Sequence, residues 1–238
     1  MNSLINKKVR FQDLGTKDYQ PTWDYQEELL KQNLDIKIQN RENPEDLKIT
    51  NNHLLFVEHP HVYTLGKSGH ESNLLANEKK LKEIEATYVK VNRGGDITYH
   101  GFGQVVGYPI LDLENFYTDI HRYMRDLEEV IIRTIAEYGL IGERSPGETG
   151  VWFDVGKPYA RKICALGVKA SRWITIHGFA LNVNTDMRYF DYIIPCGISD
   201  KQVTSMKREL EKEVDYEEVK EKIKKHFADV FGCDLFYK

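Results

Sequence analysis

One cysteine in this chain stands where a reactive thiol would be expected. Cys196 lies between Pro195 and Gly197, outside any periodic apolar pattern, so a role as a small core residue does not account for it. Its loop setting predicts an exposed thiol, and a thiolate in such a place can act as a nucleophile. We expect the other two cysteines, Cys164 in an apolar run and Cys233 near the end of the chain, to be structural.

A nucleophilic cysteine needs a basic or cationic neighbour, because a thiol with a pKa of about 8.5 is only a few per cent thiolate at neutral pH. Lys162 is the best candidate. It opens an apolar strand inside the stretch 155–185, which holds several basic residues and no Asp or Glu. This excess of positive charge would raise the thiolate fraction nearby and could attract an acidic partner. The solvated face of a hairpin explains the same stretch equally well.

Four histidines suggest other chemistry. His100 and His177 each lie beside a glycine in a segment that could line a pocket, so they rival Lys162 as the base, and a cysteine–histidine pair of the hydrolase type stays open. His59 and His61 alternate after an apolar run and suggest a metal site. No set of cysteine or carboxylate partners accompanies them. We therefore prefer packing at a strand end for this pair and expect no metal.

A glycine-rich loop, RGGDITYHGFGQ from Arg93 to Gln104, is the most unusual stretch of the chain. It has four glycines in twelve residues and lies between two apolar, strand-like runs. This density indicates backbone with positive φ or backbone that approaches a ligand closely, and a plain hairpin connection is the alternative. A phosphate-binding loop is disfavoured, because no Gly-Lys-Ser/Thr follows and the strand-to-helix setting of a dinucleotide fingerprint is missing.

The elements that must position these residues are mixed helices and strands. Apolar runs predict strands over 9–14, 53–57, 87–91, 105–113 and 150–153, and a hairpin of 162–168 with 174–183 whose turn falls near 169–172. Apolar spacing, capping residues and charge predict helices over 19–34, 78–85, 203–210 and 216–230, another from Thr118 as N-cap to Gly139, and a solvated loop over 37–48. The glycines at 167 and 178 would leave room for a substrate against the sheet.

Length and composition limit the possible functions. The 238 residues fit one domain, and a net charge of −4 gives no general reason to expect nucleic acid or a membrane as a partner. The first eleven residues lack the apolar segment of a signal peptide, and no run reaches the length of a membrane span, so we expect a soluble, cytoplasmic protein. Three cysteines are too few, and odd in number, for a secreted disulfide framework.

Four motifs, in this order, resemble those of the lipoyl(octanoyl) transferases. They are RGGDITYHGFGQ at 93–104, KICALG at 162–167, HGFALNVN at 177–184 and PCG at 195–197. The resemblance extends from about residue 58 to residue 196 and is weaker towards both ends. Phe102 stands where the family usually has proline, which bears on the local shape of the loop.

The resemblance implies an α+β fold, with a single catalytic domain over residues 1–238 in which helices flank a mixed sheet, similar to biotin and lipoate protein ligases. It implies transfer of an octanoyl group from the phosphopantetheine thioester of acyl carrier protein to a lysine of a lipoyl domain, a step of lipoate biosynthesis. The implied acceptors are lipoyl domains of 2-oxoacid dehydrogenase complexes and the glycine cleavage H protein, and no cofactor of the enzyme's own is implied. Cys196 would carry the acyl group as a thioester, and Lys162 would set its reactivity.

The same resemblance implies an acyl pocket built from three segments. Its residues would be Arg93, Gly94, Gly95, Asp96, Ile97, Thr98, Tyr99 and His100, then Ala165, Leu166 and Gly167, and then Gly178, Phe179 and Ala180. Two other functions stay open. A lipoate ligase on this fold would activate a free acid with ATP and would not need a nucleophilic cysteine, so the PCG loop favours the transferase. A non-catalytic scaffold would bind an acidic protein through residues 157–172.

Overall fold

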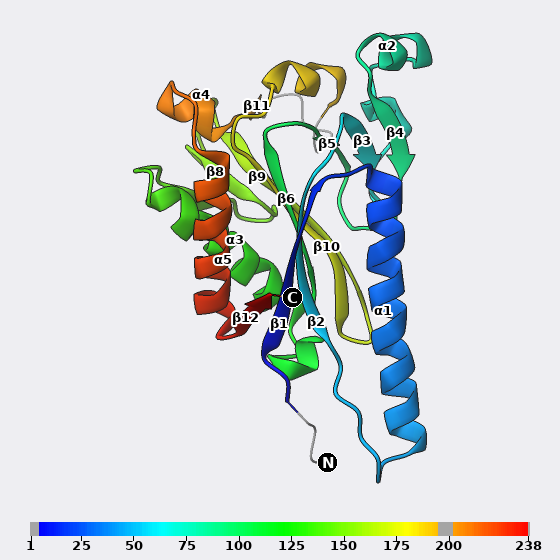
Figure 1. The fold of residues 1–238 in the computed structure, drawn as a ribbon. Helices are drawn as coiled ribbons and strands as arrows, with labels where there is room; N and C mark the ends of the chain where they lie inside the picture. Colours follow the sequence, from blue (N-terminus) through cyan, green and yellow to red (C-terminus); the bar gives the residue numbers. More distant parts are fainter. Residues whose placement is uncertain (1–4, 195–201, 238) are drawn as a thin grey trace.

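The structure is a computed structural model that describes residues 5–194 and 202–237 (Figure 1). The predicted α+β class is confirmed, with a nine-stranded mixed sheet and a three-stranded sheet among these residues. The large sheet has the order β12 (Asp234–Tyr237), β1 (Lys8–Thr16), β2 (Asn52–Glu58), β6 (Gln104–Ile110), β10 (Ile174–Asn182), β9 (Arg161–Ser171), β8 (Val151–Phe153) and β7 (Glu143–Arg144), with β11 (Gln202–Val203) added beside β9. The small sheet has the order β4 (Thr87–Lys90), β3 (Val62–Leu65) and β5 (Ile97–His100).

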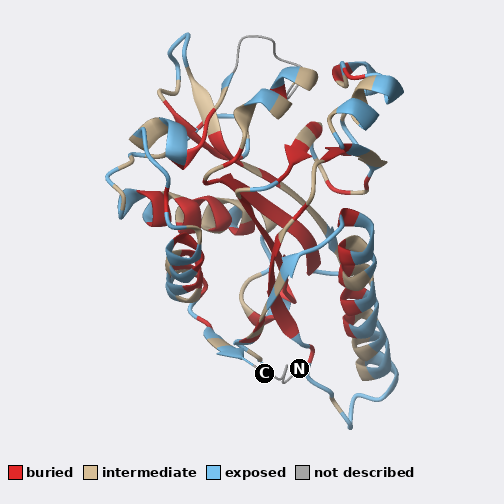
Figure 2. Ribbon diagram, turned by 45° about the horizontal axis from the view of Figure 1, so that its top comes forward, coloured by how far each residue is buried: buried red, intermediate tan, exposed pale blue. Residues whose placement is uncertain are grey.

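Helices cover both faces of the large sheet (Figure 1). On one face lies α1 (Tyr19–Glu42), and on the other lie α3 (Ile120–Ala136) and α5 (Tyr216–Phe231). The short helices are α2 (Glu78–Glu83) and α4 (Met206–Leu210), with 3₁₀ turns η1 (Glu71–Asn73), η2 (Leu113–Asn115) and η3 (Met187–Tyr192). Buried residues concentrate in the sheet and on the inward faces of these helices (Figure 2). No helix in the described ranges is long and apolar enough to cross a membrane.

Apolar spacing accounts for the two helices on the second face. In α3, buried side chains recur every three or four residues, as in Leu127, Ile131 and Ile135, and this stripe packs against the sheet in the largest core cluster. The predicted helix over 216–230 is confirmed as α5, whose N-cap Asp215 accepts a hydrogen bond from the Glu218 amide at 3.0 Å. A left-handed Gly232 follows its last turn.

Several predicted boundaries were wrong. The helix that starts at Tyr19 does not end near residue 34 but continues to Glu42, so the first half of the predicted loop over 37–48 is helix. Its polar last turns are compatible with a helix surface, and the end comes just before Pro44, which disfavours helical backbone in the residue that precedes it. The N-cap of α3 is Asp119 and not Thr118, since the Asp119 carboxylate accepts from the Arg122 amide at 3.0 Å.

Other differences come from strand pairing. Val203, expected to begin a helix, pairs with β9 together with Gln202, and α4 starts only at Met206. The strand predicted over 105–113 ends at Ile110. In the predicted hairpin, β9 continues to Ser171, so the turn is Arg172 and Trp173, which both have positive φ (48° and 70°). Strands β3, β5, β7 and β12 were not predicted.

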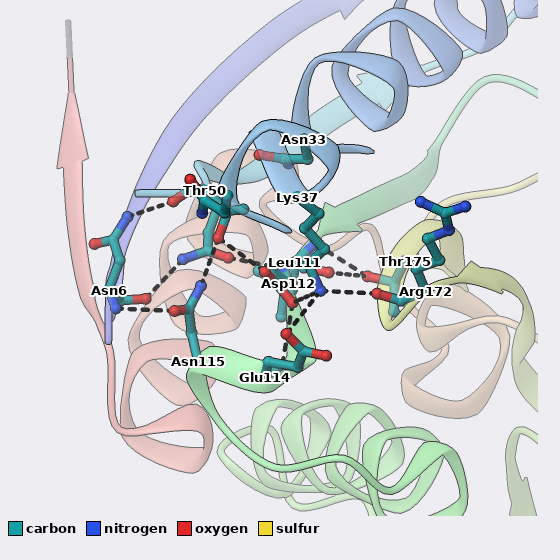
Figure 3. A network of polar contacts seen from close by, with 12 residues as sticks. Asn6, Asn33, Lys37, Thr50, Leu111, Asp112, Glu114, Asn115, Arg172 and Thr175 are labelled. Atoms are coloured by element: carbon teal, nitrogen blue, oxygen red, sulfur yellow. Dashed lines mark hydrogen bonds and ion pairs between the residues drawn. The ribbon is translucent and has the colours of Figure 1, made fainter. Parts of the chain in front are cut away.

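A buried polar cluster holds one end of the large sheet (Figure 3). The Asp112 carboxylate accepts hydrogen bonds from Lys37 Nζ at 2.7 Å, Thr50 Oγ1 at 2.8 Å and the Glu114 amide at 3.1 Å. Lys37 Nζ also donates to the carbonyl of Arg172 at 2.8 Å, which ties α1 to the tip of the β9–β10 hairpin. We call these five residues the Asp112 cluster.

Candidate active site

The glycine-rich loop and the β9–β10 hairpin face one cavity. Its lining comes from α1, from the loop and strand around β5, and from β6, β9 and β10 with the segments beside them. The lining residues are Tyr19, Arg93, Gly95, Asp96, Ile97, Thr98, His100, Gln104, Val106, Tyr108, Thr149, Lys162, Ala165, Leu166, Gly167, His177, Gly178, Phe179, Ala180, Asn182, Phe190 and Val203. We call this space the main cavity.

The floor of the main cavity is made of small residues. Ala165 pairs with Ala180 and Gly167 with Gly178 across β9 and β10, and all four line the cavity. Residues two apart on a strand share a face of the sheet, so these four form one continuous strip without long side chains. At Gly167 the missing side chain lets the glycine-rich loop approach, since a Cβ there would lie 3.0 Å from Arg93 Cδ and from the Gly94 carbonyl oxygen.

The structure brings twelve of the fourteen predicted pocket residues to this cavity and leaves out Gly94 and Tyr99. The amide of Gly94 donates to the carbonyl of Val168 at 3.0 Å, which fixes the loop on β9. Side chains alternate along β5, so Tyr99 points away from its neighbours Thr98 and His100. It is fully buried among the residues of the small sheet, with its hydroxyl 2.7 Å from His61 Nδ1.

Arg93 holds the shape of the glycine-rich loop from inside. Its guanidinium is buried and donates to the carbonyls of Gly94 at 3.0 Å, Asp96 at 2.8 Å and Thr64 at 2.7 Å. The Asp96 carboxylate accepts from Asn73 Nδ2 at 2.8 Å and from the Ile97 amide at 2.6 Å. The charged residues of this loop therefore bind the backbone and side chains around them, and they bring one positive and one negative group to the cavity wall.

A line of hydrogen bonds crosses the cavity wall from β5 to the chain before α4. His100 Nδ1 lies 2.8 Å from Gln104 Oε1, Gln104 Nε2 donates to Asn182 Oδ1 at 2.8 Å, and Asn182 Nδ2 donates to the Thr204 carbonyl at 3.0 Å. Because Gln104 Oε1 can only accept, His100 Nδ1 is the donor. Burial lowers the pKa of His100 to about 3, so its ring is neutral at pH 7. We call these four residues the His100 line.

His177 is held in an uncommon backbone conformation at the other side of the cavity. Its φ is 60°, its amide donates to Gln26 Oε1 at 2.8 Å, and its Nε2 lies 2.8 Å from Asn92 Oδ1. Burial, and then the charge of Arg93, lower the pKa of His177 to about 3. Such a ring is a weak base. The low pKa values of His100 and His177 therefore argue against a hydrolase-type cysteine–histidine pair.

Lys162 lies in the cavity wall at the start of β9. Its Nζ is 4.5 Å from the centroid of the Trp152 ring, a distance typical of a cation–π contact. The backbone of Lys162 is next to Val203 in the β9–β11 pairing, and its carbonyl accepts from the Thr204 amide at 2.9 Å. The structure thus places the predicted basic side chain at the cavity and beside β11.

Cys196 lies outside the described residues, so its predicted exposure and role remain predictions. The described chain on either side of it is bound near the cavity. Before it, the Ile194 amide donates to the Asn73 carbonyl at 2.8 Å, and Phe190 lines the cavity. After it, Val203 lines the cavity next to Lys162.

The basic stretch 155–185 is more balanced in space than in sequence. Arg161 forms ion pairs with Asp154 and Glu209, and Lys169 forms one with Glu27 at 3.0 Å. All three acids lie outside the stretch. The hairpin therefore presents less free positive charge than the sequence suggested, which weakens the scaffold alternative.

The remaining predicted residues have structural surroundings. Cys164 and Cys233 are buried, as predicted, and burial raises the pKa of both thiols, that of Cys233 to about 12. His59 is fully buried, with Nδ1 2.6 Å from the Lys17 carbonyl and Nε2 2.8 Å from the Tyr108 hydroxyl. His61 stacks on Tyr189 with ring centroids 4.0 Å apart. These contacts are the packing that we preferred for the two histidines.

Eight residues that line the cavity were absent from the predicted set, namely Tyr19, Gln104, Val106, Tyr108, Thr149, Asn182, Phe190 and Val203. A signal was available for some of them. Gln104 and Asn182 lie inside the motifs that carry the family resemblance, and Gln104, Val106 and Tyr108 alternate along one strand, as residues on one face must. Tyr19 and Phe190 come from distant elements, and the sequence holds no comparable signal for them.

Comparison with known proteins gives the family. Residues 18–228 match the model of the lipoyl protein ligase A/B catalytic domain. An octanoyltransferase of Christiangramia forsetii is 63% identical over 235 residues, which are 98% of this chain and 100% of the relative. An octanoyltransferase of Flavobacterium psychrophilum is 66% identical over 232 residues, which are 97% of this chain and 100% of the relative.

Solved structures of low identity share the fold. A lipoate-protein ligase A bound with ATP superposes with a TM-score of 0.68 at 12% identity, over 98% of this chain and 89% of that one. A biotin protein ligase from Aquifex aeolicus has a TM-score of 0.52 at 14% identity, over 95% and 71%. These likenesses confirm the predicted fold relationship, and the two octanoyltransferases of high identity show the family. The chain belongs to the lipoyl(octanoyl) transferase family, a family of acyltransferases.

Proposed function

We propose that this enzyme transfers an octanoyl group from the phosphopantetheine thioester of acyl carrier protein to a lysine of lipoyl domains, through a thioester on Cys196. The observation that carries the proposal is the main cavity, in which a strip of alanine and glycine meets the side chain of Lys162. The chain that leads to and from Cys196 is bound beside the same cavity. The close relatives named octanoyltransferase support the acyl group.

The cavity suits an aliphatic chain. The strip of Ala165, Gly167, Gly178 and Ala180 is flat and apolar, Val106 adds an apolar side chain on the same face of the sheet, and Phe190 lines the cavity as well. Burial of a methylene group contributes roughly 0.8 kcal/mol, so the six methylenes of an octanoyl chain would contribute about 5 kcal/mol. Binding of this size would hold the acyl group while one protein partner leaves and the next arrives.

The reaction needs two acyl transfers and no nucleotide. In the first, the Cys196 thiolate attacks the acyl carbonyl, the carbon–sulfur bond to the carrier breaks, and the carrier leaves as a thiol. In the second, a neutral lysine amine of the lipoyl domain attacks the enzyme thioester, an amide forms, and Cys196 is released. Exchange between two thioesters is nearly isoenergetic, and an amide is more stable than a thioester. The sequence of steps therefore runs downhill.

Lys162 would serve both transfers. As a cation within about 4 to 6 Å of Cys196 it would lower the pKa of the thiol by one to three units, and once neutral it could accept the proton of the thiol or of the incoming amine. The cation–π contact with Trp152 limits where the ammonium can lie. This contact comes from the neighbouring strand β8, which pairs with β9 at this residue.

Intact-mass spectrometry tests the proposal. The protein is incubated with octanoyl acyl carrier protein alone, without ATP, and we expect a mass increase of one octanoyl group that hydroxylamine removes. Cys196→Ala should lose the adduct, whereas Cys233→Ser, a matched change at a buried thiol, should keep it. When a lipoyl domain is then added to the isolated adduct, it should take up the octanoyl group.

The same experiment distinguishes the proposed transferase from an ATP-dependent ligase, whose fold this chain shares. An unchanged protein mass with the acyl carrier protein, together with lipoyl-domain modification that requires free octanoate and ATP, would replace the transferase by the ligase. Binding of the carrier without any transfer would support the scaffold alternative.

A further inference from the structure

A second cavity, of about 400 Å³, lies between α1 and the edge of the large sheet. It is lined by Asn6, Lys8, Arg10, Leu29, Gln32, Asn51, Asn52, His53 and Phe236. It shares no lining residue with the main cavity, and none of these side chains has a part in the proposed transfer. We call it the edge cavity.

Strand register places three of its side chains in a row. Arg10 on β1 is the direct partner of Phe236 on β12 and of His53 on β2. Neighbouring strands are about 4.8 Å apart and directly paired residues share a face, so the ring, the guanidinium and the imidazole lie side by side. Leu29 and Gln32 of α1 border the same space.

The positive charge of this row has no counter-charge in the cavity. The lining includes Lys8 and Arg10 but neither Asp nor Glu. Within residues 5–194 and 202–237, neither cation is in an ion pair, and Arg10 Nε is buried without a hydrogen-bond partner. Arg10 is partly buried and Lys8 is exposed, so an anion that enters the cavity can reach both cations.

His53 gives an independent observation at the same place. It is 7% exposed, and its Nδ1 is buried without a hydrogen-bond partner. Burial, and then the charge of Arg10, lower the pKa of His53 to about 4. An unpartnered buried polar atom costs about 1 to 3 kcal/mol, which a bound hydrogen-bonding ligand would offset.

Several amide side chains around the edge cavity already have hydrogen-bond partners. Asn33 Nδ2 donates to the Asn51 carbonyl and the Asn51 amide donates back to Asn33 Oδ1, both at 2.8 Å. Asn52 Nδ2 donates to the Asn6 carbonyl at 2.8 Å, and Asn52 Oδ1 accepts from the Asp112 amide at 2.9 Å. The amide side chains are therefore already fixed, and the cationic row is left for a ligand.

We propose that the edge cavity binds the phosphate group of a small molecule, held by Arg10, Lys8 and His53, with the Phe236 ring against the rest of the ligand. A phosphate fits better than a carboxylate because a dianion can meet both cations, a guanidinium can bind two of its oxygens, and the neutral His53 ring can offer it one hydrogen bond. The site is independent of the acyl transfer.

The test is a titration of the full-length enzyme with sodium phosphate at pH 8, where the dianion dominates, at constant ionic strength kept with sodium chloride. We expect a saturable shift of the His53 imidazole resonance in NMR and a saturable rise in melting temperature. Arg10→Gln and Lys8→Gln should each weaken phosphate binding at least tenfold. Lys31→Gln, which removes an exposed cation on α1 outside the cavity, should bind phosphate as the parent does.

The proposed site would be wrong if the His53 resonance shifted linearly with phosphate, as it would with chloride, or if the parent and both cavity variants bound phosphate equally. If Arg10→Gln does not fold, Lys8→Gln at an exposed position still decides. Tighter saturation by sodium acetate than by phosphate would overturn the phosphate assignment.

Discussion

Two buried polar groups of this protein, the Asp112 cluster and the His100 line, use the same kinds of side chain to different ends. In the Asp112 cluster the carboxylate is surrounded by donors from α1, from the chain before β2 and from η2 (Figure 3). The His100 line is equally well hydrogen-bonded, yet His100, Gln104 and Asn182 border the main cavity. The difference lies beside these groups, because Ala165, Gly167, Gly178 and Ala180 continue the same face of the sheet with small side chains. Buried polar residues border a cavity here because their neighbours on the sheet are small.

Lys162→Met tests the site end of this comparison and should have the largest effect. The change keeps the length and the apolar stem of the side chain but removes the amine, so acyl transfer should fall about 10² to 10⁴-fold, as is typical when an acid–base group is lost. Single-turnover formation of the octanoyl adduct measures this loss. The urea midpoint should stay near that of the parent, and a large drop in stability would make Lys162 a structural residue instead.

Asp112→Ala tests the other end of the comparison. It leaves the buried Thr50 hydroxyl without its acceptor and leaves Lys37 with Glu114 as its only carboxylate among the described residues, so we expect a loss of about 1 to 3 kcal/mol in the free energy of unfolding. Denaturant unfolding measures the loss. Activity per folded molecule should be unchanged, and Glu114→Gln, which removes an exposed partner of Lys37, should cost less than about 1 kcal/mol. Equal costs for the two variants would contradict the buried role of Asp112.

Local sequence predicted the site better than the cluster. The glycine-rich loop and the small residues of the hairpin are adjacent in sequence within each segment, and the family resemblance joined the segments, so most of the main cavity could be named. The Asp112 cluster joins Lys37, Thr50 and Arg172, whose proximity depends on tertiary packing alone. The same limit explains why β12, which pairs with β1 at the opposite end of the chain, was missed. It also explains why acids outside the basic stretch were not recognised as its partners.

The histidines at the main cavity should make the stability of the protein depend on pH, which distinguishes the main cavity from the Asp112 cluster. The folded-state pKa of His177 is about 3, below the ordinary 6.5, so protons bind the unfolded chain more readily. Stability is therefore full above pH 6.5 and falls as the pH drops from 6.5 towards 3, by up to about 1.4 kcal/mol per pH unit for this residue. Urea midpoints measured between pH 7 and pH 4.5 should show a smaller slope in His177→Gln. An unchanged slope would mean that His177 is protonated in the folded protein.

The smallest expected effect comes from the turn of the β9–β10 hairpin, which the Asp112 cluster supports at its tip. Arg172 has a φ of 48° and an exposed side chain, and a left-handed conformation costs a residue with a side chain about 1 kcal/mol more than glycine. Arg172→Gly should therefore raise the melting temperature by a few degrees and leave acyl transfer unchanged. Gly178→Ala, on the same hairpin at the main cavity, should lower the melting temperature, because its Cβ would lie 2.2 Å from the Gly107 carbonyl oxygen. Stabilisation by both changes, or by neither, would show that the two ends of this hairpin do not differ as their backbones indicate.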